Sequence, residues 1–152
     1  MHRPLYQRYA HGVSLLELLI VLALIALVAG MVLPTFGSGV PTSELKSAAR
    51  QLAAGLRIAR SEALSQKREA FLSLDLEGRR FKVDHDPREY SLPPRVNLKL
   101  FTAQSDIVNE KIGAIRFFPD GGSNGGRITV AAGERKYEVD VDWLTGRVAI
   151  LE

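Results

Sequence analysis

A single carboxylate, Glu17, lies near the start of a long apolar stretch and five residues after Gly12. A charged group held in lipid is costly and usually has a partner of opposite sign. No Lys, Arg or His follows Glu17 until Lys46, so the apolar stretch contains no such partner. Hydrolysis of the Gly12–Val13 bond would give Val13 a free ammonium group, which could pair with Glu17 of another copy or of a related subunit. The chemistry predicted here is proteolytic processing followed by ion pairing.

The apolar stretch, residues 13–33, has the length of one membrane crossing. As a helix, its 21 residues would extend about 31 Å, which matches the hydrocarbon core of a bilayer. A short basic leader with Arg3 and Arg8 precedes it, at residues 1–12. By the positive-inside rule, we expect the leader in the cytoplasm and the chain after Leu33 in the periplasm. The sequence therefore predicts a single-pass protein of the bacterial inner membrane.

This segment resembles the class III signal of type IV pilins and type II secretion pseudopilins. The basic leader ends in Gly12, Glu17 would be the fifth residue of the mature chain, an apolar helix follows, and Pro34 falls where pilin helices commonly bend. The resemblance implies that a prepilin peptidase cleaves between Gly12 and Val13, that Val13 is N-methylated, and that Glu17 acts in filament assembly. Val13 departs from the pattern, because the family usually has Phe there.

Two alternatives explain part of this segment. An ordinary cleaved signal peptide has an apolar core of about 7 to 15 residues, which is shorter than the stretch found here. An uncleaved signal anchor explains the apolar length but not the placing of Gly12 and Glu17.

The rest of the chain is long enough for one soluble domain with a single core, at about 115 residues. The formal net charge is +3, but Arg3 and Arg8 of the leader supply two of those charges. From residue 70 onward, 12 Lys and Arg face 13 Asp and Glu, so nucleic acid is not an expected partner. The chain has no cysteine, which excludes disulfides, zinc–thiolate sites and cysteine nucleophiles.

Three clusters could hold a metal or carry out a reaction. Asp84-His85-Asp86 offers metal ligands, but it falls in a predicted loop without a second cluster at ligand spacing. Residues 120–126 are glycine-rich but lack the strand–loop–helix context of a phosphate-binding loop. Asp140 and Asp142 lie on one side of a predicted strand, and such a pair alone indicates no reaction. We therefore expect no enzyme activity, no metal and no cofactor.

A bend followed by an amphipathic helix is predicted for residues 34–69. Prolines and glycines between Pro34 and Pro41 interrupt the first helix. Helix resumes at Thr42 or Ser43, either of which could cap it, and continues to about Arg68. Steps of three and four residues place seven apolar residues on one face: Leu45, Ala48, Ala49, Leu52, Leu56, Ala59 and Ala63.

Charges of opposite sign border this apolar face. The basic flank consists of Lys46, Arg50, Arg57 and Arg60. The acidic flank consists of Glu44, Glu62 and Glu69. One interpretation is that both flanks are solvated. The other interpretations are that the basic flank of one subunit meets the acidic flank of a neighbour in a helical assembly, or that it contacts nucleic acid.

Residues 70–152 show the two-residue period of β-strands. Segments 71–76 and 80–83 flank Glu77-Gly78 and predict a hairpin. We expect further strands near 96–101, 114–118, 127–131, 136–141 and 147–151, a loop over 84–95, and Trp143 packed at a strand end. The predicted fold class is α+β, with one long helix packed on antiparallel sheet, in two small sheets.

A second resemblance is carried by the C-terminal third. Ile115-Arg116-Phe117-Phe118-Pro119-Asp120-Gly121, Gly125-Gly126 and Trp143-Leu144-Thr145-Gly146-Arg147-Val148 are similar to the end of H-type minor pseudopilins and of FimT/FimU-type pilins. The resemblance implies a type IV pilin-like fold and a structural subunit of the periplasmic pseudopilus, near its tip, that takes part in export of folded proteins across the outer membrane.

The partners implied are other minor pseudopilins, the major pseudopilin, the prepilin peptidase, the inner-membrane secretion platform and, before assembly, membrane lipid. Two other functions stay open from the sequence. One is a minor pilin of a type IV pilus or DNA-uptake system. The other is a signal-anchored periplasmic binding module.

Overall fold

The computed structural model describes residues 14–32, 41–109 and 111–152. The chain divides into two compact units, Met1–Ser38 and Gly39–Glu152. Three residues that the sequence singles out, Gly12, Val13 and Pro34, lie outside the described residues.

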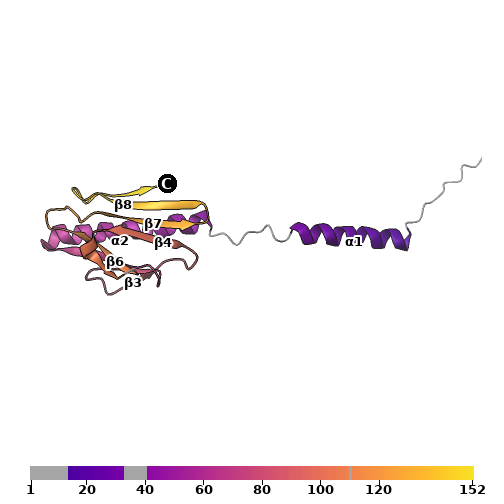
Figure 1. Ribbon diagram of the computed structural model, residues 1–152, viewed down its shortest axis with the longest axis horizontal. Helices are drawn as coiled ribbons and strands as arrows, with labels where there is room; N and C mark the ends of the chain where they lie inside the picture. The colour runs from indigo at the N-terminus through magenta and orange to yellow at the C-terminus, as the bar shows by residue number, and fades with distance from the viewer. Residues whose placement is uncertain (1–13, 33–40, 110) are drawn as a thin grey trace, which may run out of the picture. The chain divides into compact units, whose positions relative to one another are not determined.

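The first unit contains helix α1, Leu15–Val32 (Figure 1). Ser14 precedes the helix and caps its first turn, because its Oγ accepts a hydrogen bond from the Leu16 N–H at 3.2 Å. Glu17 lies in the first turn, where the helix dipole favours a negative charge. The large apolar side chains between Leu15 and Val28 are 47% to 78% exposed, so this part of α1 has no buried face among the described residues.

In the described part of the chain, no helix meets both the length and the apolar character that a membrane crossing requires. The segment predicted to cross, 13–33, is described only in part, because Val13 and Leu33 lie outside the described residues.

The second unit is built on helix α2, Thr42–Gln66. All seven residues of the predicted apolar face are buried, together with Ala53 and Gly55. A Cβ atom at Gly55 would lie 2.8 Å from Phe81 Cε2 and 2.9 Å from Leu72 Cδ1. The alanines and this glycine therefore let the helix approach the sheet closely.

Helix α2 begins at Thr42, as predicted, but its N-cap and its last residue differ from the prediction. The N-cap is Pro41, not Thr42 or Ser43, and no side chain caps the helix; the Pro41 carbonyl accepts hydrogen bonds from the N–H groups of Glu44 and Leu45 at 2.9 and 3.3 Å. At the other end Lys67 adopts a left-handed conformation, with φ 54° and ψ 37°. A residue in this conformation ends a helix, so α2 stops at Gln66 rather than Arg68.

Two antiparallel sheets follow, as predicted. The first has the strand order β3-β2-β1-β6-β5, and its strands are β1 (Ala70–Asp75), β2 (Arg80–Val83), β3 (Glu89–Ser91), β5 (Ile107–Asn109) and β6 (Ile112–Phe117). The second has the order β4-β7-β8-β9, with β4 (Asn97–Thr102), β7 (Gly126–Ala132), β8 (Arg135–Val141) and β9 (Val148–Leu151). A short 3-10 helix, η2 (Gln104–Asp106), precedes β5.

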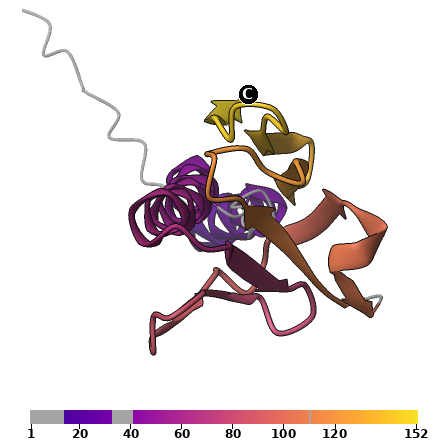
Figure 2. The same ribbon diagram turned by 90° about the vertical axis from the view of Figure 1, so that its left-hand side faces the viewer.

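Helix α2 contacts strands of both sheets. Figure 2, which looks along α2, shows the C-terminal strands and the β1–β2 hairpin on different sides of this helix. The core therefore combines residues from all three elements: Leu52 of α2, Leu72 and Ile115 of the first sheet and Val139 of the second are each 0% exposed. This arrangement is the predicted α+β class.

The hairpin predicted around Glu77-Gly78 is confirmed. Strands β1 and β2 pair with Leu74 opposite Phe81. The Gly78 N–H donates a hydrogen bond to Asp75 Oδ1 at 2.7 Å, which closes the turn. The other five predicted strands correspond to β4, β6, β7, β8 and β9, with ends that agree to within about two residues.

The loop predicted over 84–95 is wrong in part, because it contains strand β3. Tyr90 of β3 pairs with Phe81 of β2, and their rings stack with centroids 5.0 Å apart. The prolines that suggested a loop, Pro87, Pro93 and Pro94, flank β3 rather than interrupt it. Proline cannot donate a ladder hydrogen bond, but beside a short edge strand it does no harm.

Candidate assembly surfaces

The N-terminal candidate centres on Glu17. Its carboxylate is exposed in the first turn of α1, and the helix contains no Lys, Arg or His. The apolar side chains around it are exposed on every side of the helix. A helix that is apolar all round is normally buried in a protein core or a membrane, and neither the helix nor its carboxylate has such a partner in the described part of this unit.

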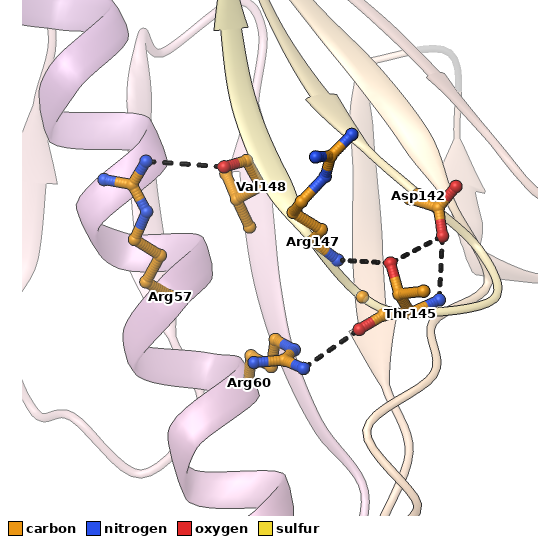
Figure 3. A pocket seen from close by; sticks show the side chains of 7 residues that line it. Arg57, Arg60, Asp142, Thr145, Arg147 and Val148 are labelled. Carbon is orange, nitrogen blue, oxygen red and sulfur yellow. Dashed lines mark hydrogen bonds between the residues drawn. The ribbon is translucent and has the colours of Figure 1, made fainter.

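Three of the four residues of the basic flank contact the C-terminal part of the same chain. Lys46 Nζ pairs with Glu152 Oε1 at 3.4 Å. Arg57 Nη2 donates to the Val148 carbonyl at 3.4 Å, and Arg60 Nη2 donates to the Thr145 carbonyl at 3.0 Å (Figure 3). The basic flank of α2 therefore helps to hold the β8–β9 hairpin, in addition to any contact with a neighbour.

The turn between β8 and β9 is shaped by Asp142. Its Oδ1 accepts hydrogen bonds from the Thr145 hydroxyl at 2.7 Å and from the Thr145 N–H at 2.8 Å. These hydrogen bonds lower the pKa of Asp142 below its ordinary value. The carboxylate is therefore ionised at neutral pH and its Oδ1 is already engaged.

Gly146 is required in this turn for two reasons. Its φ is 61°, in the left-handed region that side chains disfavour. A Cβ atom there would also overlap the Gly121 carbonyl oxygen and would lie 2.9 Å from Arg60 Nε. The missing side chain therefore gives the Arg60 guanidinium its place against the turn.

A cavity of about 620 Å³ lies between α2 and this turn. We name it the arginine cavity, and its lining consists of Arg57, Arg60, Asp142, Thr145, Gly146, Arg147 and Val148 (Figure 3). Three of these residues are cationic and one is anionic. The Arg60 Nε atom is buried and has no hydrogen-bond partner among the described residues.

The acidic flank has three different environments. Glu44 is exposed in the first turn of α2. Glu62 is half-buried, and its Oε2 is buried without a hydrogen-bond partner in the described part of the chain. Glu69 pairs within the chain, with its Oε2 2.8 Å from Arg116 Nη1. A continuous row of free carboxylates is therefore not present.

Sequence patterns gave no sign of the ionic network around Asp106. This carboxylate is 4% exposed and lies 2.6 Å from Arg116 Nη2, while Asn124 Nδ2 donates to it at 2.8 Å. Burial by itself raises the pKa of Asp106, but the hydrogen bonds from Arg116 and Asn124 outweigh that effect and hold the pKa below its ordinary value. Asp106 lies in a stretch without a motif, so only the three-dimensional pairing identifies it.

The Asp84-His85-Asp86 cluster serves the local structure. Asp84 Oδ2 lies 3.2 Å from Arg68 Nη1, and Asp86 Oδ1 lies 3.0 Å from Arg88 Nε. Among the described residues, no group of three His, Cys, Asp or Glu side chains is arranged to hold a metal ion.

Trp143 is 67% exposed, so the prediction that it packs at a strand end is wrong. It follows the end of β8, where the turn carries it away from the core. Together with Phe101, which is 78% exposed, it borders a second cavity of about 850 Å³.

Asp140 also lines this cavity and pairs with Arg127 at 2.9 Å, whereas Asp142 shapes the turn. The two carboxylates therefore have separate partners.

Solved structures identify the fold. The chain matches the crystal structure of the type IV minor pilin FimU of Pseudomonas aeruginosa with a TM-score of 0.57 and 19% identity, over 73% of this chain and 90% of that chain. It matches the minor pseudopilin EpsH from the type 2 secretion system of Vibrio cholerae with a TM-score of 0.57 and 13% identity, over 71% of this chain and 96% of that chain. These likenesses show the fold, which is type IV pilin-like.

Sequence comparisons then define the family. The family model for the type II transport protein GspH matches residues 48–145, and the prokaryotic N-terminal methylation motif matches residues 7–33. Type II secretion system protein H of Xanthomonas campestris pv. campestris is 34% identical over 145 residues, which cover 95% of this chain and 85% of that protein. The chain belongs to the GspH family of type II transport proteins.

Proposed function

We propose that this chain is a minor pseudopilin of the type II secretion system. It is a structural subunit of the periplasmic pseudopilus, near its tip, that takes part in the export of folded proteins across the outer membrane, and it catalyses no reaction. The observation that carries this proposal is membership of the GspH family through residues 48–145, together with an N-terminal methylation motif over residues 7–33. The similarity to FimU concerns the fold alone, whereas the GspH family model and protein H match the sequence. The sequence matches therefore favour secretion over a type IV pilus.

The N-terminal segment carries the assembly mechanism. A prepilin peptidase cleaves between Gly12 and Val13, and Val13 becomes the N-methylated first residue. The exposed apolar surface of α1 is covered first by inner-membrane lipid and then by the helices of other pseudopilins. In that environment of low dielectric constant, Glu17 pairs with the terminal amine of a neighbouring subunit.

The same proposal gives the topology and the partners. Residues 1–12 lie in the cytoplasm, residues 13–33 cross the inner membrane once, and residues 70–152 form the periplasmic β domain. Pro34 bends the chain before the amphipathic residues up to 69. The partners are other minor pseudopilins, the major pseudopilin, the prepilin peptidase and the inner-membrane platform; contact with nucleic acid is not expected.

The test is Glu17→Ala in the native bacterium. Removing one partner of a buried ion pair typically costs about 3 to 5 kcal/mol, so the variant should lose its leader but enter the pseudopilus poorly and support little secretion. Mass analysis of the N-terminus, recovery of the protein with the pseudopilus and secretion of cargo measure the three effects. Glu134→Ala, in the exposed β7–β8 turn, is the matched control and should behave as wild type.

Two results would contradict the proposal. One is a protein that keeps residues 1–12 in cells with an active prepilin peptidase, which would favour a signal-anchored module. The other is normal secretion after deletion of the gene together with loss of pili or of DNA uptake, which would favour a type IV minor pilin.

A further inference from the structure

Several arginines of the second unit have a carboxylate partner. Ion pairs with Asp or Glu are formed by Arg68, Arg80, Arg88, Arg116 and Arg127. The arginine cavity differs from these sites, because Arg57 and Arg60 donate to the neutral carbonyls of Val148 and Thr145 and form no ion pair with a carboxylate of the described residues. Arg147 acts on Asp142 through its charge, without a hydrogen bond or an ion pair between the two side chains in the described residues. Within the described part of the chain, these three guanidinium groups therefore have no hydrogen bond or ion pair with a carboxylate.

The acidic residue of the cavity does not compensate for them. Asp142 is the one carboxylate in the lining, and its Oδ1 accepts both hydrogen bonds from Thr145. The lining thus carries an excess of positive charge, which attracts an anion into a concave site.

We propose that the arginine cavity binds a carboxylate side chain of a neighbouring pseudopilus subunit; this inference rests on the proposed function. A guanidinium presents a planar fork of N–H donors that matches the two oxygens of a carboxylate. Arg57 comes from α2 and Arg147 from the turn before β9 (Figure 3), so an acidic side chain held between them would bridge the helix and the hairpin.

Arg60 is a positioning residue in this site. Its hydrogen bond to the Thr145 carbonyl and its fit beside Gly146 hold the turn against α2. Because Arg147 belongs to this turn, it lines the same cavity as Arg57. Substitution of Arg60 would therefore disturb the site indirectly, and the test uses Arg57 and Arg147 instead.

The size of the cavity favours a protein segment over a small ion. About 620 Å³ falls in the range of ligand pockets and is much larger than an inorganic anion needs. Val148 adds an apolar wall to the charged lining, which suits the methylene groups of an Asp or Glu side chain. An inorganic anion remains an outcome that the experiment can detect.

The experiment is photo-crosslinking of the full-length protein in the native bacterium. A photoreactive amino acid replaces Leu144, which is 67% exposed and adjacent to the cavity residue Thr145. We expect a crosslink to another pseudopilin, reduced on the order of tenfold in the Arg57→Gln/Arg147→Gln variant, because charged hydrogen bonds are lost. The Arg57→Lys/Arg147→Lys variant keeps the charge and should retain part of the crosslink. Arg88→Gln, which removes an arginine already paired with Asp86, is the matched control and should retain all of it.

Three outcomes would overturn the inference. The first is a Leu144 crosslink of equal yield in the double Gln variant, and the second is an equal loss in Arg88→Gln. The third is stabilisation of the purified full-length protein by inorganic phosphate, dependent on Arg57 and Arg147, without a subunit crosslink in cells; that result would assign the cavity to a small anion. A double Gln variant with an unchanged unfolding temperature excludes misfolding as the cause of a lost crosslink.

The proposed function is tested separately in the same strains. If deletion of the gene abolishes secretion and the leader is removed, but the Leu144 crosslink is absent, only the cavity inference fails. If deletion leaves secretion intact, the proposed function fails.

Discussion

Replacing Arg116 by methionine would remove the cation that neutralises the most buried carboxylate of the described chain. Asp106 is 4% exposed and Arg116 is 33% exposed. Arg116 Nε and Nη2 both donate to Asp106 Oδ1, at 2.9 and 2.6 Å. Methionine keeps much of the aliphatic packing beside Phe71, over whose ring the guanidinium lies. The substitution therefore tests the charge with little change in volume.

The expected loss of stability follows from the burial of Asp106. Removing one member of a buried ion pair costs about 3 to 5 kcal/mol. Asn124 and Ser105 still donate hydrogen bonds to Asp106 in the variant, at 2.8 and 3.2 Å, so we expect the lower end, about 3 kcal/mol. Asp106→Asn should cost less, about 1 to 2 kcal/mol, because the partly exposed Arg116 keeps its pair with Glu69.

The loss should depend on pH. The pKa of Asp106 is lower in the folded protein than its ordinary value of 3.8. The stability that the ion pair contributes is therefore present above about pH 4 and is lost as the pH falls through the folded-state pKa. The destabilisation caused by Arg116→Met should consequently shrink as the pH is lowered from about 7 to about 3.

Urea and thermal unfolding of the full-length protein in detergent micelles, followed by circular dichroism, measures these effects. Arg127→Met is the control, because Arg127 also contacts two carboxylates, Glu138 and Asp140, but at an exposed position. Exposed ion pairs contribute little to stability, so this variant should lose much less. The reasoning would be refuted if both variants lost the same stability, or if the loss in Arg116→Met did not change with pH.

Two further predictions concern the turn before β9. Gly146→Ala should cost about 1 to 2 kcal/mol for the left-handed backbone and more for the overlap with the Gly121 carbonyl oxygen. Gly133→Ala is the control and should show the backbone cost alone, because Gly133 has φ 60° and nothing lies within 4 Å of the new Cβ. Equal losses of unfolding free energy in the two variants would contradict the steric argument. The pKa of Asp142 is lowered by its hydrogen bonds with Thr145, so its contribution to stability is present above about pH 4 and is lost as the pH falls through the folded-state pKa. Asp142→Asn should therefore lose stability at neutral pH and show a weaker decline in unfolding temperature toward acid; a decline equal to that of wild type would contradict it.

Elements governed by local periodicity were predictable. All seven apolar positions that the steps of three and four residues predicted for the α2 face are buried, because a helix brings those positions to one side whatever it packs against. The β1–β2 hairpin was predictable for a similar reason, since alternation and a turn residue lie within a few positions of each other. The start of α2 at Thr42 was predictable, but its caps were not, because Pro41 and Lys67 bound the helix through backbone conformation rather than through a capping side chain.

Strand β3 and the exposure of Trp143 were missed. Strand β3 pairs with β2, where Tyr90 stacks on Phe81, and the surrounding prolines concealed it in the sequence. Tryptophan is a residue type that favours burial, yet the turn after β8 exposes Trp143. Residue type sets the tendency to be buried, but the path of the chain decides whether a buried place is available.

The sequence by itself determined the family and the N-terminal methylation motif. Gly12, Glu17 and the apolar stretch lie within one short segment of the chain, so the motif that they form can be recognised without knowledge of the fold. Only the tertiary structure decided what the charged residues of α2 contact. Arg57 and Arg60 are separated from Val148 and Thr145 by 91 and 85 positions. Periodicity can place a charge on a face, but the partner of that charge is set by the packing of elements far apart in the chain.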